Sequence, residues 1–141
     1  MAGELSDDEL AFLHSLLDFA RDGRTGDLAA AIDGGVPVNL TSASGDSLLL
    51  LAAYHDHPAT VRMLLEHGAD PDRVNDRGQT ALGAAVFRRS RESATRLLEH
   101  GADPHAGTRS AVQIAAFFEL DEMAALLEAG SPQAPSADDA P

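Results

Sequence analysis

The sequence predicts an all-α protein, a solenoid of stacked helix-turn-helix units joined by short β-turn or hairpin connections. One segment, Leu-Leu-Glu-His-Gly-Ala-Asp-Pro, occurs at residues 64–71 and again at 97–104, an offset of 33 residues. Hydrophobic residues make up 44% of the chain but aromatic residues only 4%, so Ala and Leu supply most of the apolar side chains. Small side chains of this kind favour closely packed short helices over a β-sandwich.

The repeat extends over most of the chain. The same offset relates Gly45 to Gly78, and a shortened version of the pattern closes the repeat region. We count four units, at about residues 9–41, 42–74, 75–107 and 108–130. Together they predict a single domain over residues 1–130. Residues 131–141 are rich in Pro, Ala and Asp and predict a disordered tail.

Each unit is expected to contain two short helices. In unit two the first runs from Ser47 to Tyr54 and the second from Pro58 to Glu66. Proline suits the first turn of a helix because the N–H that it lacks would be unpaired there. Gly68 follows the second helix, where a positive φ is easiest for glycine. Because one unit cannot bury its apolar face alone, stacking of the units completes the core.

The outer units are expected to cap the stack. Residues 6–9, Ser-Asp-Asp-Glu, predict a capping box in which Ser6 and Glu9 close the first turn of the opening helix. Acidic residues at that position also suit the positive end of the helix dipole. At the other end, unit four has a shortened turn from Ala106 to Arg109.

Three features carry a family resemblance, most closely over residues 42–107. They are the period of 33, the Leu-Leu-x-x-Gly-Ala-Asp segments, and the Gly-x-Thr-x-Leu-x-x-Ala pattern from Gly78 to Ala85. Together they resemble ankyrin repeats, as in small proteins of bacterial type. The family's usual Thr-Pro-Leu-His stretch appears here as Ser-Leu-Leu-Leu at 47–50 and Thr-Ala-Leu-Gly at 80–83. The His that normally ties neighbouring units together is therefore missing.

A column of residues is the first candidate binding surface. The residue after the Ala-Ala pair, or its equivalent, is Arg21, Tyr54, Phe87 and Phe117 in the four units. The resemblance implies that this position ends the inner helix and faces a concave groove used for partners. Tyr, Phe and Arg are enriched at interfaces, so we expect a binding stripe. The alternative is that Phe87 and Phe117 fill gaps between helices. Phe118 is expected in the core or the cap.

Charged and polar residues beside this column form the second candidate surface. His55 and Arg88 follow the aromatic residues of their units. The turns are expected to project Asp46, Asp76, Arg77, Gln79 and Arg109 at their tips. Loops on a rigid scaffold are where recognition residues usually lie. The alternative is an ordinary solvated surface.

The charge balance limits the classes of partner. The chain has 23 acidic residues and 10 basic ones, all of them Arg, for a net charge of -13. We therefore expect no binding to nucleic acid or to anionic membranes, and a basic protein surface would be the natural complement. No signal peptide and no apolar run of about 20 residues is visible, so we expect a cytoplasmic protein.

Catalytic and metal-binding patterns are scarce in the sequence. It contains no Cys, no Gly-rich phosphate loop and no Gly-x-Ser-x-Gly turn. His67 and His100 are one repeat apart, which at roughly 10 Å between packed helices is too far to share a zinc ion. We expect no enzymatic activity, no metal and no cofactor.

These observations predict a non-catalytic protein–protein interaction module, an adaptor or regulator, acting as a monomer. Two alternatives remain open. The first is an acidic inhibitor or immunity-type protein that masks a basic enzyme, such as a nuclease or toxin. The second is a structural role in a homo-oligomer. The sequence does not name the partner, because repeat scaffolds recognise unrelated targets through their surface residues.

Overall fold

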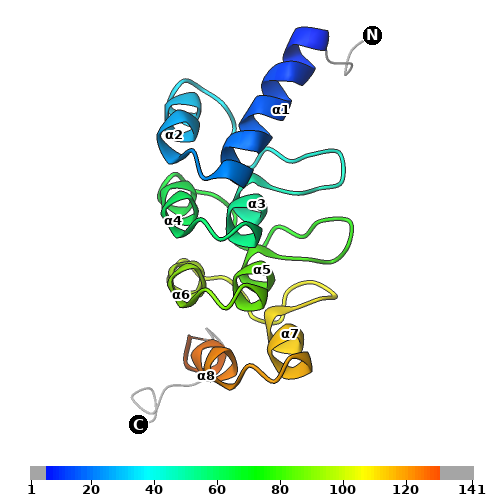
Figure 1. The fold of residues 1–141 in the computed structure, drawn as a ribbon, viewed down its shortest axis with the longest axis vertical. Helices are drawn as coiled ribbons and strands as arrows, with labels where there is room; N and C mark the ends of the chain where they lie inside the picture. Colours follow the sequence, from blue (N-terminus) through cyan, green and yellow to red (C-terminus); the bar gives the residue numbers. More distant parts are fainter. Residues whose placement is uncertain (1–5, 131–141) are drawn as a thin grey trace.

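The computed structural model describes residues 6–130, which form eight α-helices arranged as four stacked pairs (Figure 1). The inner column consists of α1 (Asp7–Asp22), α3 (Leu48–Tyr54), α5 (Ala81–Phe87) and α7 (Ala111–Phe117). The outer column consists of α2 (Thr25–Asp33), α4 (Pro58–Glu66), α6 (Arg91–Glu99) and α8 (Asp121–Gly130). The predicted all-α solenoid is confirmed. The tail predicted over residues 131–141 lies outside the described residues.

The helix bounds repeat with the period of the sequence. The outer helices α2, α4 and α6 begin at Thr25, Pro58 and Arg91, each 33 residues after the last. The inner helix α7 begins 30 residues after α5, at 111 against 81. This step is shorter because the connection over 100–110 is shorter than the one over 67–80.

Side-chain caps fix where the inner helices begin. Ser47, Thr80 and Ser110 each accept a hydrogen bond from the backbone N–H three residues later, which satisfies a donor that the helix itself leaves unpaired. The predicted capping box between Ser6 and Glu9 is present at the start of α1. These caps place the first residue of each inner helix at the same point of its unit.

The core lies between the two helix columns and between neighbouring pairs. Its fully buried side chains include Ala53, Leu64, Leu82, Ala85 and Leu97. In α3 the first six residues are all buried, so this helix is apolar on every side. That is possible because α3 packs against helices above, below and behind it, as Figure 1 shows.

Three hairpin-like loops, over residues 34–47, 67–80 and 100–110, project from the side of the inner helices (Figure 1). Within the first loop, Thr41 and Ser47 form an antiparallel bridge. Gln79 and Arg109 form a parallel bridge between the second loop and the third. The loops are therefore joined to one another as well as to the helices that they precede.

The Oγ of Ser93, in α6, is the one buried side-chain polar atom of residues 6–130 that lacks a hydrogen-bond partner. Its counterpart in the unit before is Thr60, whose hydroxyl lies 2.7 Å from that of Thr25. One unit further along, the position of Thr25 is occupied by Pro58, which has no hydroxyl. Ser93 is thus unpaired because the repeat changes at its partner position.

We expect Ser93→Ala to raise the free energy of unfolding by about 1 kcal/mol, since it removes a buried unpaired hydroxyl and introduces a better helix former. Thr60→Val should lower it by about 1 kcal/mol, because it breaks the bond to Thr25. Urea unfolding followed by circular dichroism measures both. A loss of stability in Ser93→Ala would show that the Ser93 hydroxyl makes a stabilising hydrogen bond after all.

Candidate partner-binding groove

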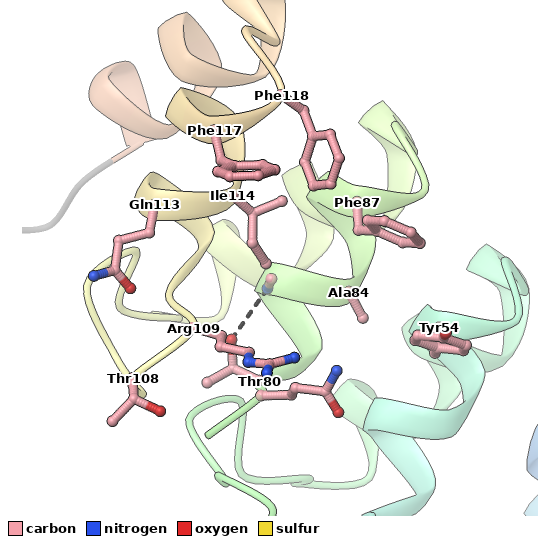
Figure 2. Close-up of a pocket in the computed structure, with 12 residues that line it drawn as sticks. Tyr54, Thr80, Ala84, Phe87, Thr108, Arg109, Gln113, Ile114, Phe117 and Phe118 are labelled. Carbon is pink, nitrogen blue, oxygen red and sulfur yellow. Dashed lines mark hydrogen bonds between the residues drawn. The ribbon is translucent and has the colours of Figure 1, made fainter. Parts of the chain in front are cut away.

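An open hollow of about 630 Å³ lies between α5 and α7, beside the loops that precede them (Figure 2). Its lining is mainly apolar, with polar groups on the loop side. The lining residues are Tyr54, Gln79, Thr80, Gly83, Ala84, Phe87, Thr108, Arg109, Gln113, Ile114, Phe117 and Phe118. A volume of this size falls within the range of pockets that hold small molecules or the side chains of a partner.

Aromatic rings form one wall of the hollow. Tyr54 and Phe87 lie at the ends of α3 and α5, and their rings stack with centroids 6.3 Å apart at an angle of 12°. Phe118, the cap of α7, meets Phe87 edge-on at 5.7 Å and Phe117 at 4.9 Å. All four rings are exposed, by 42% for Tyr54, 46% for Phe87, 45% for Phe118 and 80% for Phe117. The run therefore crosses three inner helices without being part of the core.

One expectation for this surface is wrong. Phe118, for which the core was one of the two predicted places, is exposed and stands between Phe87 and Phe117 in the last unit. Its position in the repeat indicates this exposure, because it is equivalent to His55 and Arg88, which are predicted surface residues. Arg21, predicted as the first residue of the column, pairs its guanidinium with Asp18 at 2.8 Å on the same helix.

Small residues form the floor of the hollow. Gly83 and Ala84 lie in the middle of α5, and the N–H of Gly83 donates to Thr80 Oγ1 at 3.0 Å (dashed in Figure 2). A Cβ on Gly83 would lie 3.2 Å from both the carbonyl oxygen of Arg109 and the Cδ1 of Ile114. The third loop and α7 therefore pack closely against a position where α5 has no side chain.

One buried side chain, Asn75, joins two of the loops. Its Nδ2 donates to Asp46 Oδ1 and to Gln79 Oε1, both at 2.8 Å, and its Oδ1 accepts from the backbone of Arg77 and Gln79. The side chains of Asp46 and Gln79, two predicted contact residues, therefore serve to hold the loops. No repeated feature of the sequence points to Asn75, since Ser42 stands one unit before it.

The remaining loop residues are free to project. Asp76, Arg77 and Arg109 are exposed. The N–H of Arg109 donates to the carbonyl of Gly78 at 3.0 Å, and Gly78 has φ of 78°, a conformation that favours glycine. This bond fixes the backbone of Arg109 at the loop side of the hollow. Within residues 6–130 its guanidinium makes no ion pair.

The groove runs along the rings from Tyr54 to Phe118. His55 lies at its Tyr54 end, where the two rings meet edge-on with centroids 5.3 Å apart. Partial burial lowers the pKa of His55 below its usual 6.5, because the charged imidazolium loses hydration. The neighbouring His57, Arg21 and Arg88 lower the pKa further through charge repulsion. Asp22 opposes them. His55 is therefore mainly neutral at pH 7, in a setting where positive charges outweigh one carboxylate.

A family model of ankyrin repeats, in three copies, matches residues 16–108. The chain belongs to the ankyrin repeat family. This agrees with the stacked helix pairs and with the loops on their inner side. Ankyrin repeats are generally protein–protein interaction modules and typically non-catalytic scaffolds.

Named relatives share the repeats over part of their length. An ankyrin repeat protein of Pseudomonas aeruginosa, PA3287, is 45% identical over 60 residues, which cover 43% of this chain and 35% of that protein. The human NAD-capped RNA hydrolase NUDT12 is 48% identical over 50 residues, 36% of this chain and 11% of the hydrolase. The human ASB11 ankyrin repeat domain superposes with a TM-score of 0.74 at 30% identity, covering 86% of this chain and 56% of that domain. The chain thus spans about half or less of each of these relatives.

Replacing Arg88 with Ser should raise the pKa of His55 toward its usual value, because it removes one of the positive charges that oppose protonation of the imidazole. A titration of the imidazole protons by NMR measures the pKa. Arg62→Ser is the matched control, since Arg62 pairs with Glu66 on α4 and does not act on His55. An unchanged pKa in Arg88→Ser would show that Arg88 does not contribute to the lowered pKa of His55.

Proposed function

We propose that this chain is a non-catalytic adaptor or regulator that docks a protein partner along its concave groove. The run of exposed rings from Tyr54 through Phe87 to Phe118, beside the hollow, is the observation that carries the proposal. An exposed apolar surface of this extent costs free energy in water, and a partner that covers it recovers that energy. Aromatic side chains also lose little conformational entropy on binding, which makes them effective anchors.

Charged residues around the rings would supply selectivity. Asp76, Arg77 and Arg109 project from the loops, and His55 and Arg88 follow the rings at the ends of the inner helices. Charges at the rim of an interface affect the choice of partner and the rate of association more than the affinity. The groove spans three units, which is enough for a standard interface of about 800 Å² per partner. Neither catalysis nor a cofactor enters this role.

A second candidate function is that of an acidic inhibitor that masks a basic enzyme. The net charge of -13 favours it, because a strongly acidic protein attracts a basic one over several ångströms before contact. The two functions use the same groove and differ in the overall charge of the partner. The structural homo-oligomer has no comparable support, and we infer a monomer in solution.

The location of the protein in the cell stays a prediction. None of the helices in residues 6–130 is both long enough and apolar enough to cross a membrane. The cytoplasmic location expected from the sequence is consistent with this finding. Fluorescence microscopy of the tagged full chain in its native cell would determine the location directly.

The double variant Tyr54→Ala/Phe87→Ala should retain its circular dichroism spectrum and its monomeric mass by light scattering, because both rings are exposed. Its capture of the native partner should fall about tenfold or more, as for the loss of two interface anchors. Affinity purification from the native cell with quantitative mass spectrometry measures the capture. Phe12→Ala, which removes an exposed ring on α1 outside the groove, is the control. Equal capture by the double variant and the wild type would refute the groove assignment.

If the partner is a basic enzyme, its association rate with this chain should fall about tenfold or more when NaCl is raised from roughly 0.05 to 0.5 M. Salt screens the attraction between opposite net charges, whereas it changes dissociation much less. Stopped-flow fluorescence or surface plasmon resonance measures the rate. A rate that does not depend on salt would exclude the inhibitor and leave the adaptor.

A further inference from the structure

At the floor of the hollow, one position of the repeat has lost its side chain. Leu50, Gly83 and Gln113 are equivalent, since each lies three residues after the cap of its inner helix. In unit two, Leu50 is buried and fills the space beside its helix. In unit three, the carbonyl oxygen of Arg109 and the Cδ1 of Ile114 occupy that space, each 3.2 Å from where a Cβ on Gly83 would lie. Gly83 therefore lets the third loop and α7 approach α5 at the floor of the hollow.

The chemistry of the lining has two parts. The inner part is apolar and is formed by Ala84, Ile114 and the rings of Phe87, Phe117 and Phe118. The loop side is polar, and Arg109 is the only charged residue of 6–130 that lines the hollow. No carboxylate from this described part of the chain contributes to the lining, although the chain as a whole is strongly acidic. The hollow thus combines an apolar interior with one positive charge at its edge.

The positive charge at this edge is available for a partner. The backbone of Arg109 is fixed through its bond to Gly78, while its exposed guanidinium makes no ion pair within residues 6–130. Arg77 on the second loop and Arg88 beside Phe87 are likewise exposed, and neither belongs to an ion pair of the described chain. A guanidinium presents a planar fork that matches a carboxylate with two hydrogen bonds.

We infer that the hollow binds a linear segment of the partner protein that packs one aromatic or leucine-sized side chain against the rings of the lining and places an acidic side chain on Arg109. The inference rests on the proposed function and specifies the chemistry of the segment that docks. The apolar side chain contacts Ala84, Ile114 and the rings that line the hollow. The carboxylate meets the charge that the chain itself leaves unpaired.

The partner's charge at this contact is negative, whereas the net charge of the chain favours a positively charged partner. Net charge acts at long range and is screened over about 8 Å in physiological salt, whereas a hydrogen-bonded ion pair acts at contact. A basic partner satisfies both conditions only if its docking segment is itself acidic. Short peptides separate the two effects, because they contain the segment without the rest of the partner.

The test uses the full chain and four pools of short fluorescein-labelled peptides. Each peptide has a central Phe or a central Ala, flanked either by Asp and Glu or by Lys and Arg, with Gly and Ser elsewhere. Fluorescence anisotropy at physiological salt measures the dissociation constants. We expect the pool with Phe and acidic flanks to bind at least tenfold more tightly than each of the other three.

Three variants, compared with two matched controls, locate the binding. Arg109→Gln should weaken binding of the acidic Phe pool about tenfold, and Arg109→Lys should weaken it less, because it keeps the charge but not the fork. Arg73→Gln, at an exposed loop residue outside the hollow, should leave binding unchanged. Phe117→Ala should also weaken binding, and Phe12→Ala should not, since Phe12 is exposed on α1.

Three outcomes would overturn the inference. They are tighter binding of the basic pools, an effect of Arg109→Gln no larger than that of Arg73→Gln, and no binding of any pool. Each is separable from the proposed function, which stands as long as capture of the native partner depends on Tyr54 and Phe87. If capture is also independent of those rings, the proposed function fails as well.

Discussion

The close packing of neighbouring inner helices is the constraint on which the rest of the structure depends. Ala53 and Ala85 are fully buried where successive units meet, and their size allows the helices to approach. As a result, α3 and α5 are buried at every residue except the last, Tyr54 in one and Phe87 in the other. Packing this close leaves only helix ends and loops for recognition. The aromatic residues at those ends are therefore placed by the packing of the core.

The turn after each inner helix is repeated with the same geometry. The residue that follows the helix cap has a positive φ in three successive units, at Asp56, Arg89 and Glu119, and Gly23 has one at the equivalent point of the first unit. A left-handed conformation costs a non-glycine residue about 1–2 kcal/mol, so it persists only where the surrounding structure requires it. Here it reverses the chain so that each outer helix packs behind its own inner helix. Identical turns give the units a common offset, and this offset brings Tyr54 over Phe87.

The sequence predicts the structure correctly wherever a feature repeats and fails where a unit departs from the pattern. The period predicted α4 from Pro58 to Glu66 to the residue, because the period, the proline and the glycine beyond the helix agree. Asn75 could not be predicted, since its role depends on two loops that only the stacking brings together. Phe118 was misjudged because two adjacent aromatic residues suggest a core, and the cap position that exposes the second is a matter of register. Which predicted contacts bind a partner depends on the partner and cannot follow from this chain alone.

Gly83 connects the stability of the stack to its selectivity. Glycine inside a helix is less favourable than alanine by about 0.5–1 kcal/mol, and Gly83 also gives up the packing that Leu50 provides in the previous unit. The third loop uses the space next to Gly83, because its backbone at Arg109 approaches more closely than a side chain would allow. The same approach places the Arg109 guanidinium at the edge of the open space. A larger residue at this position would press on the carbonyl oxygen of Arg109 and on Ile114, so the positive edge and the apolar side of the hollow both depend on this glycine.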